Sequence, residues 1–124
     1  MIDPIEDMPA RSIGFRITGE VTDADYVDVL VPALKAAAGS GEVRLLLVGE
    51  EGFDLGSLRA RFETARKDPD LDIGNKKDWR RVAVVADVNF FIRRLFPGLA
   101  KVVPVDVKLF DAKDEAEARS WIAG

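Results

Sequence analysis

Two nearly continuous apolar runs constrain the fold of this chain most. VRLLLV occupies residues 43–48, and RVAVVAD occupies residues 81–87. Runs of this kind are typical of central strands that are covered on both faces, as in a parallel sheet between helices. Parallel neighbours need a crossover connection, which is usually helical. The two runs therefore predict an α/β fold.

Weaker patterns on either side complete the sheet. Residues 2–5 contain Pro4 and suit an edge strand, residues 12–18 alternate apolar and other side chains, and residues 105–110 supply the last strand. The expected order is ββαβαβαβα in one domain spanning residues 1–124. We expect a single-layer, mixed, mostly parallel five-stranded sheet flanked by helices, with the first strand antiparallel at one edge.

Caps and breakers locate the predicted helices. Thr22 with Asp25 fits a capping box, and Ser57 is placed to cap the next helix. Pro32 predicts a bend in the first helix, because proline removes a backbone hydrogen bond. Pro97 and the adjacent Gly98 should interrupt the helix that starts at Asn89. Asp111 or Asp114 should cap the last helix. The side chains that should dock this helix and the C-terminus are Ala116, Ala118, Trp121 and Ile122.

Composition narrows the chemistry. The 124 residues include no histidine and no cysteine, so the usual general base near neutral pH and thiolate ligands or nucleophiles are missing. We therefore expect no enzyme activity, no metal and no cofactor. The formal net charge of −4 gives no electrostatic footprint for nucleic acid.

The same features bear on localisation. The N-terminus MIDPIEDMPA lacks the basic residues and apolar run of an export signal, and no apolar stretch is long enough for a membrane span. An absence of cysteine is compatible with a reducing compartment. The expected localisation is cytoplasmic.

Several phrases together are similar to the SpoIIAA-like family. They are GFRITGEVTDADYVDVLVPALKAA, VRLLLVG with a following F-D-x-G turn, DWRRVAVVADVNFFIRRLF, and a closing EAxxWI helix. The resemblance implies a fold like that of STAS domains, which include anti-sigma-factor antagonists, and an architecture compared with CRAL-TRIO lipid carriers. It therefore implies regulatory protein contacts or the binding of an apolar ligand.

The resemblance also points to the turn at residues 53–57. Antagonists of the STAS type carry a phosphorylatable serine directly after an aspartate at this turn. Asp54 matches the acidic position, but Leu55 stands where the serine would be. Ser57 is then either a substitute phosphorylation site at a helix N-terminus or an ordinary helix cap.

Two aspartates follow predicted parallel strands, at the sheet edge where ligands usually bind in α/β folds. Asp54 and Asp87, with Glu50 and Glu51 nearby, offer oxygen ligands of the kind that magnesium prefers. Aspartates at strand ends also commonly cap the next helix. We expect the cap and no metal.

The segment FFIRRLF combines large apolar side chains with two arginines. An interfacial helix on lipid has this composition, but helical spacing also lets Phe91, Ile92, Leu95 and Phe96 face the core. If the helix moves, Phe53, Phe91, Phe96 and Leu99 would line a gap for an acyl chain. These alternatives define the candidate ligand-binding residues, which are Phe53, Asp54, Ser57, Asp87, Phe91 and Phe96.

Basic residues between 66 and 81 alternate with aspartates, which predicts a solvated loop over residues 68–78 rather than a phosphate site. Trp79 should pack at the sheet edge and Trp121 should anchor the last helix, although either would also suit a subunit contact. The sequence as a whole indicates a non-enzymatic binding or regulatory module that contacts a protein partner or a second copy. The alternative is a small carrier or sensor of an apolar, lipid-like molecule.

Overall fold

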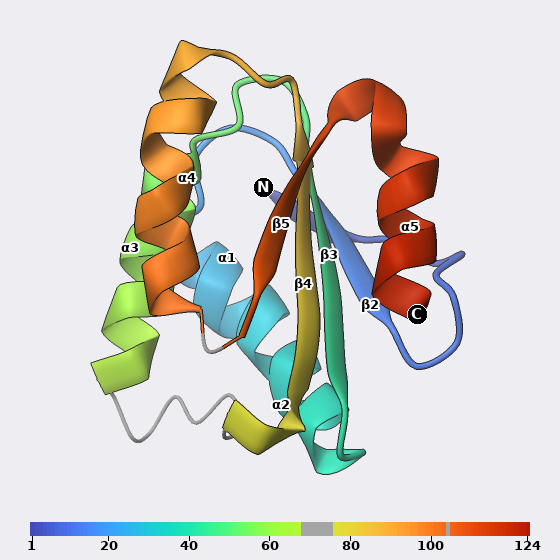
Figure 1. The fold of residues 1–124 in the computed structure, drawn as a ribbon. Helices are drawn as coiled ribbons and strands as arrows, with labels where there is room; N and C mark the ends of the chain where they lie inside the picture. Colours follow the sequence, from blue (N-terminus) through green and yellow to red (C-terminus); the bar gives the residue numbers. More distant parts are fainter. Residues whose placement is uncertain (68–75, 104) are drawn as a thin grey trace.

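In the computed structural model, which describes residues 1–67, 76–103 and 105–124, the chain forms a five-stranded sheet (Figure 1). The strand order is β1-β2-β3-β4-β5. β1 pairs antiparallel with β2, and the remaining neighbours are parallel. The predicted mixed, mostly parallel sheet and the order of elements are thus confirmed. The strands are β1 (Ile2–Pro4), β2 (Ile13–Ile17), β3 (Val43–Gly49), β4 (Trp79–Ala86) and β5 (Val107–Asp111).

Helices cover both faces of this sheet. The helix pair α1–α2, α3 and α4 lie on one face, and α5 lies on the other (Figure 1). Short 3-10 turns precede β4 and α5. The helical segments are α1 (Asp23–Asp25), the π-helical turn η1 (Tyr26–Leu30), α2 (Val31–Gly39), α3 (Leu55–Lys67), η3 (Lys76–Asp78), α4 (Phe90–Val102), η4 (Ala112–Asp114) and α5 (Glu115–Ala123).

The central strands divide their side chains between two cores. Leu45 and Leu47 of β3 are buried in the larger core beneath α1 to α4. Leu46 and Val48 of the same strand belong to the smaller core with Ala118 and Ile122 of α5. Successive strand residues point to opposite faces, so a strand covered on both sides needs an unbroken apolar run. This explains why VRLLLV and RVAVVAD do not alternate.

The disturbance predicted at Pro32 takes the form of a π-helical turn. Proline offers no N–H to the carbonyl of Asp28, and the turn directly before it is wider than an α-helical turn. Its last bond runs from the N–H of Val31 to the carbonyl of Tyr26. Within this turn Tyr26 is fully buried, whereas Val27 is only half-buried.

The predicted interruption of α4 at Pro97 and Gly98 is wrong, because the helix continues to Val102. Ile92 on one side of the proline and Leu99 and Val102 on the other are all buried. Packing of these side chains holds both halves in one helix beside α3. Pro97 itself is exposed, so solvent can satisfy the carbonyl that it leaves without a donor.

The last helix begins differently from the prediction. Asp111 caps η4 by accepting a bond from the N–H of Lys113, and Asp114 makes no side-chain cap. Trp121 anchors α5 by packing on Phe110, with ring centroids 5.8 Å apart. Ala116, which was expected to dock this helix, is exposed.

Trp79, which was expected to pack at the sheet edge, instead begins β4 in the interior, between β3 and β5. Its ring lies edge-on to that of Phe62, with centroids 6.5 Å apart. Much of the predicted loop over residues 68–78 lies outside the described residues, which contain only η3 of it. In the described part of the chain, no helix has both the length and the apolar character needed to cross a membrane.

Candidate functional site

The carboxyl ends of β3, β4 and β5 meet at one edge of the sheet, and a hollow opens there. Its volume is about 570 Å³. The sequence analysis placed candidate ligand-binding residues at this edge. Of these, the structure brings Phe53 and Asp87 together in the hollow. The lining residues are Gly49, Glu50, Glu51, Gly52, Phe53, Ala86, Asp87, Asn89, Ile92 and Ala112.

Phe53 forms one wall of the hollow. Its ring packs so closely on Gly49 that a Cβ atom at this glycine would overlap the ring. The N–H of Phe53 donates to the carbonyl of Glu50 at 3.1 Å, which folds the loop back on the end of β3. The ring is therefore held in place before any ligand arrives.

Asp54 is a helix cap and does not line the hollow. Its Oδ1 accepts a 3.2 Å hydrogen bond from the N–H of Ser57 in the first turn of α3. Among the residues that the structure describes, no group of three or more acidic side chains is arranged to hold a metal ion. The cap that we expected for Asp54 is what the geometry supports.

Ser57 does not cap α3, which corrects the prediction from its position. Its hydroxyl donates to the carbonyl of Asp54 at 2.8 Å and accepts from the N–H of Val21, also at 2.8 Å. The helix starts two residues earlier, at Leu55. The hydroxyl therefore joins α3 to the segment after β2.

Asp87 keeps an exposed carboxylate at the rim of the hollow. The next helix is capped by Asn89, whose Oδ1 accepts a 3.0 Å bond from the N–H of Ile92. The cap that we expected for Asp87 is therefore wrong, because Asn89 lies at the start of the helix and performs this task. Asp87 makes no hydrogen bond or ion pair to the residues described here.

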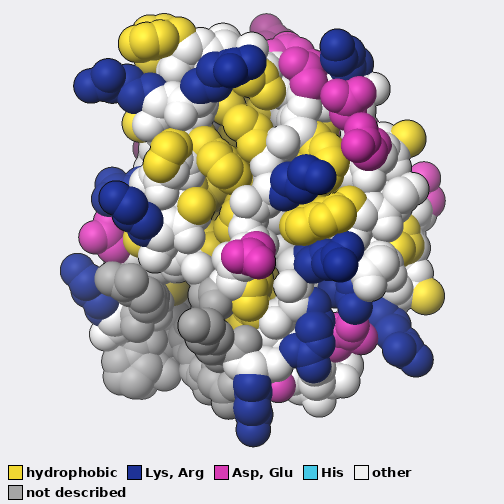
Figure 2. Space-filling model, viewed as in Figure 1, with side chains coloured by type: hydrophobic (Ala, Val, Ile, Leu, Met, Phe, Trp, Pro, Cys, Tyr) yellow, Lys and Arg dark blue, Asp and Glu magenta, His cyan; other side chains and the backbone are white. Residues whose placement is uncertain are grey.

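A second feature lies beside the hollow, on the first turns of α4. Phe90 is 69% exposed, Phe91 71% and Leu95 38%. The two phenylalanine rings touch edge-to-face, with centroids 5.7 Å apart. Figure 2 shows hydrophobic side chains over the start of this helix, at the upper left, with Lys and Arg side chains beside them. We call Phe90, Phe91 and Leu95 the α4 tip.

The expectation that Phe91 and Leu95 face the core is wrong. The Asn89 cap fixes where the helix begins, and from there Ile92, Leu99 and Val102 face inward. Phe96 is half-buried and packs against the larger core. Neither Phe91 nor Phe96 lines the hollow, so the four residues proposed for an acyl-chain gap are not brought together.

Positive charge surrounds the α4 tip. Arg93 and Arg94 lie between Phe91 and Leu95 in the sequence, Lys101 follows in the last turn, and the helix has no acidic residue. The chain as a whole has a net charge of −4, so this helix departs from its surroundings in sign. An apolar surface with a cationic rim suits an acidic partner.

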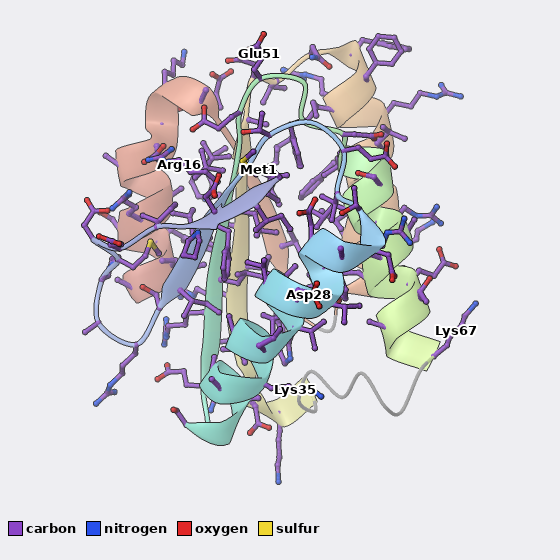
Figure 3. All side chains as sticks on the ribbon, turned by 180° about the vertical axis from the view of Figure 1, so that it is seen from behind. Met1, Arg16, Asp28, Lys35, Glu51 and Lys67 are labelled. Carbon is purple, nitrogen blue, oxygen red and sulfur yellow. The ribbon has the colours of Figure 1, made fainter. Side chains whose placement is uncertain are left out.

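An ion-pair network joins Glu50, in the lining of the hollow, to β2 and α5, and sequence reasoning missed it. Arg16 of β2 donates to Glu50 at 2.9 Å and to both carboxylate oxygens of Glu115 at 3.2 Å. The hydrogen bond from Arg16 lowers the pKa of Glu115 below its ordinary value. In Figure 3, Arg16 lies beside α5, while Glu51 projects from the loop after β3. Residues this far apart in sequence carry no local pattern that would pair them.

Comparison with known proteins identifies a family. A family model described as SpoIIAA-like matches residues 12–123, which is nearly the whole chain. No curated protein and no solved structure matches significantly.

Proposed function

Because the chain belongs to the SpoIIAA-like family, we propose that it is a non-enzymatic regulatory or binding module that acts through contact with another protein. The proposal takes residues 1–124 as one domain, in keeping with the single sheet that both cores share. It also places the protein in the cytoplasm. A chain without cysteine forms no disulfides, so it needs no oxidising environment.

The α4 tip is the observation that carries this proposal. Two neighbouring phenylalanines are about 70% exposed. Covering a side chain of this size contributes roughly 1.5–3 kcal/mol relative to leaving it in water. Aromatic residues and arginine are also the types enriched in protein interfaces. An apolar tip rimmed by arginines therefore fits a partner surface with an apolar recess and acidic residues around it.

The partner is either a different protein or a second copy of this chain. In a second copy, the acidic rim of the hollow, which includes Glu51 and Asp87, supplies charge opposite to that of the arginines. In a different protein, complementary charge must come from that protein. At micromolar concentration the isolated chain should dimerise if its partner is a second copy, and should stay monomeric if its partner is a different protein.

The first experiment compares the tagged wild-type chain with Phe91→Ser, both purified from host cells. We expect a defined protein to accompany the wild type and to be lost from the variant, or the wild type alone to sediment as a dimer. The matched control is Glu117→Gln on α5, an exposed change away from the tip. Association that is equal in all three proteins contradicts the proposal.

The hollow supports a second candidate function, carriage of a small apolar molecule. Phe53 and Ile92 provide apolar walls, and pockets of this size hold drug-sized ligands. Because Glu51 and Asp87 stand at its rim, the ligand would be neutral or cationic rather than a fatty acid. Native mass spectrometry of protein from its host, followed by denaturing extraction, tests this. A bound mass that Phe53→Ser removes supports carriage, and a bare chain contradicts it.

A further inference from the structure

A second and larger hollow lies at the opposite edge of the sheet, near the amino ends of the parallel strands. Its volume is about 820 Å³. It opens between the end of α2, the segment that leads into β2, and the start of β4. The end of α2 and the start of β4 lie in the lower half of Figure 1. We call it the α2 groove. Its lining residues are Arg11, Ser12, Ile13, Ala33, Ala36, Ala37, Ser40, Gly41, Glu42 and Arg80.

The floor of the α2 groove is apolar and smooth. Ile13, Ala33 and Ala37 are half-buried and pack on the larger core. Ala36 adds a further methyl group from α2. Because alanine side chains are short, they leave a shallow trough rather than a closed surface. A slender apolar chain laid along it would remove these methyl groups from water.

Two arginines at the rim retain uncompensated charge. Arg11 makes no hydrogen bond or ion pair to any residue that the structure describes. The guanidinium of Arg80 donates to the backbone carbonyls of Lys77, Trp79 and Gly41 and, within the same described residues, to no carboxylate. Carbonyl contacts orient a guanidinium but do not neutralise it. Both cations therefore stay available to an anion.

The one carboxylate at the rim does not cancel them. Glu42 is held by Arg44, whose Nε donates to its Oε1. This hydrogen bond lowers the pKa of Glu42 below its ordinary value, and Arg11 and Arg80 act in the same direction at longer range. One carboxylate thus faces three guanidiniums, which leaves positive charge in excess.

The end of α2 does not compete for the arginines. Its last carbonyls accept bonds from the N–H groups of Ser40 and Gly41. These internal bonds satisfy the carbonyls of Ala36, Ala37 and Ala38, which a helix C-terminus otherwise leaves without donors. The arginines are therefore not drawn into capping the helix.

Arg11 also sits where glycine is favoured. The N–H of Ser12 donates to the carbonyl of Pro9 at 3.2 Å, which closes a turn, and Arg11 has φ of 66° within it. Left-handed backbone is costly for a residue with a Cβ atom. Glycine would adopt this backbone conformation at a lower free-energy cost, but it would not supply the positive charge of the arginine.

From this arrangement we propose that the α2 groove binds an organic anion with an apolar tail. The anionic group lies between Arg11 and Arg80, and the tail lies on the alanine floor of α2. This site is separate from the α4 tip and does not depend on the function proposed for it.

The test titrates the full chain with octanoate, below its micelle-forming concentration, while backbone amides are followed by NMR. We expect shifts at Ile13, Ala36 and Ala37 on the groove floor. Arg80→Gln and Arg11→Gly should each weaken octanoate binding about tenfold, as loss of one charge-assisted hydrogen bond predicts. Glycine suits the backbone at position 11, so the second variant keeps the fold. Lys113→Gln, in η4 near the other edge of the sheet, removes one charge and should leave binding unchanged.

Two further probes separate the parts of the proposed ligand. Acetate carries the charge without the tail, and octyl glucoside carries the tail without the charge, so both should bind at least about tenfold more weakly than octanoate. The proposal is overturned if octanoate does not bind, if its shifts centre on Phe53 and Ile92 in the other hollow, or if either arginine variant binds like the wild type. Equal binding of acetate or octyl glucoside overturns it as well.

Discussion

The N–H of Val21 donates a 2.8 Å hydrogen bond to the hydroxyl of Ser57. Val21 is fully buried, so this N–H depends on the serine for a partner. A phosphate on Ser57 would break the present arrangement of the hydroxyl, which also donates to the carbonyl of Asp54. The serine is therefore a link between α3 and the segment after β2, whatever further role it has.

Replacing this link should be costly. We expect Ser57→Ala to lower the free energy of unfolding by about 1–3 kcal/mol, because a buried donor is left without a partner. Chemical denaturation measures the change. Thr64→Ala is the matched control, since the Thr64 hydroxyl bonds only the carbonyl of Ala60 on the exposed side of the same helix. A loss for Ser57→Ala no larger than that for Thr64→Ala would show that the Val21 bond contributes little.

The α4 tip should be dispensable for folding. Phe91→Ser should change the free energy of unfolding by no more than about 0.5 kcal/mol, as is usual for exposed positions. Its neighbour Ile92 is 6% exposed. Ile92→Ala should cost about 2–5 kcal/mol through the cavity that it leaves. Thermal or urea denaturation of the two variants compares them directly. A large loss of stability in Phe91→Ser would mean that the side chain packs inside the protein.

Tyr26 buries a hydroxyl that has no hydrogen-bond partner in the described part of the chain. Burial raises the pKa of this side chain, so the neutral phenol persists at any ordinary pH. Tyr26→Phe keeps the edge-to-face contact with Phe62 and removes the unpaired group. We expect its stability to equal or exceed that of the wild type in urea denaturation, and Tyr26→Leu to be less stable. A less stable phenylalanine variant would reveal a partner for the hydroxyl.

Glu115 should make stability depend on pH. Arg16, and to a lesser extent Arg119, lower the pKa of Glu115 in the folded state. These ion pairs therefore stabilise the protein fully above the ordinary glutamate pKa of about 4.3, and their contribution fades as pH falls through the lower folded value. We expect Glu115→Gln to be less stable than the wild type at neutral pH and the difference to shrink in acid.

Urea denaturation at pH values from about 3 to about 7, in steps of about one pH unit, measures the difference in stability between Glu115→Gln and the wild type. Glu117→Gln is the control, because Glu117 is exposed on the same helix and makes no ion pair with described residues. A difference between Glu115→Gln and the wild type that stays constant across this range would mean that the ion pairs of Glu115 with Arg16 and Arg119 add nothing.

The sheet could be predicted because its signals are local. The apolar pattern of a strand indicates how many of its faces are covered. Residues 12–18 alternate with period two, which indicates one covered face, and the apolar runs at 43–48 and 81–87 indicate two. The orientation of α4 could not be predicted in the same way. Its apolar residues cover one broad face of the helix, and Phe91 and Leu95 lie toward one side of that face, so their spacing does not tell which part of the face is buried. That depends on where Asn89 starts the helix and on packing against α3.

The candidate site was predicted in part for the same reason. Phe53 and Asp87 reach one hollow because both follow parallel strands, and that rule is a matter of topology. Asp54 and Ser57 also follow a parallel strand, but the Asp54 side chain caps α3 and the Ser57 hydroxyl bonds the segment after β2. The contact between Arg16 and Glu115 spans 99 residues and has no signature in either segment.

Photo-crosslinking in host cells tests most directly whether the α4 tip contacts a protein. Benzoylphenylalanine replaces Phe91 in one chain and Glu117 in a matched control, and the adducts are identified by mass. We predict a defined protein adduct, either another protein or a second copy of this chain, from position 91 alone, and its loss when Phe90→Ser is added. An adduct with lipid only, equal adducts from both positions, or none at position 91 would contradict the account.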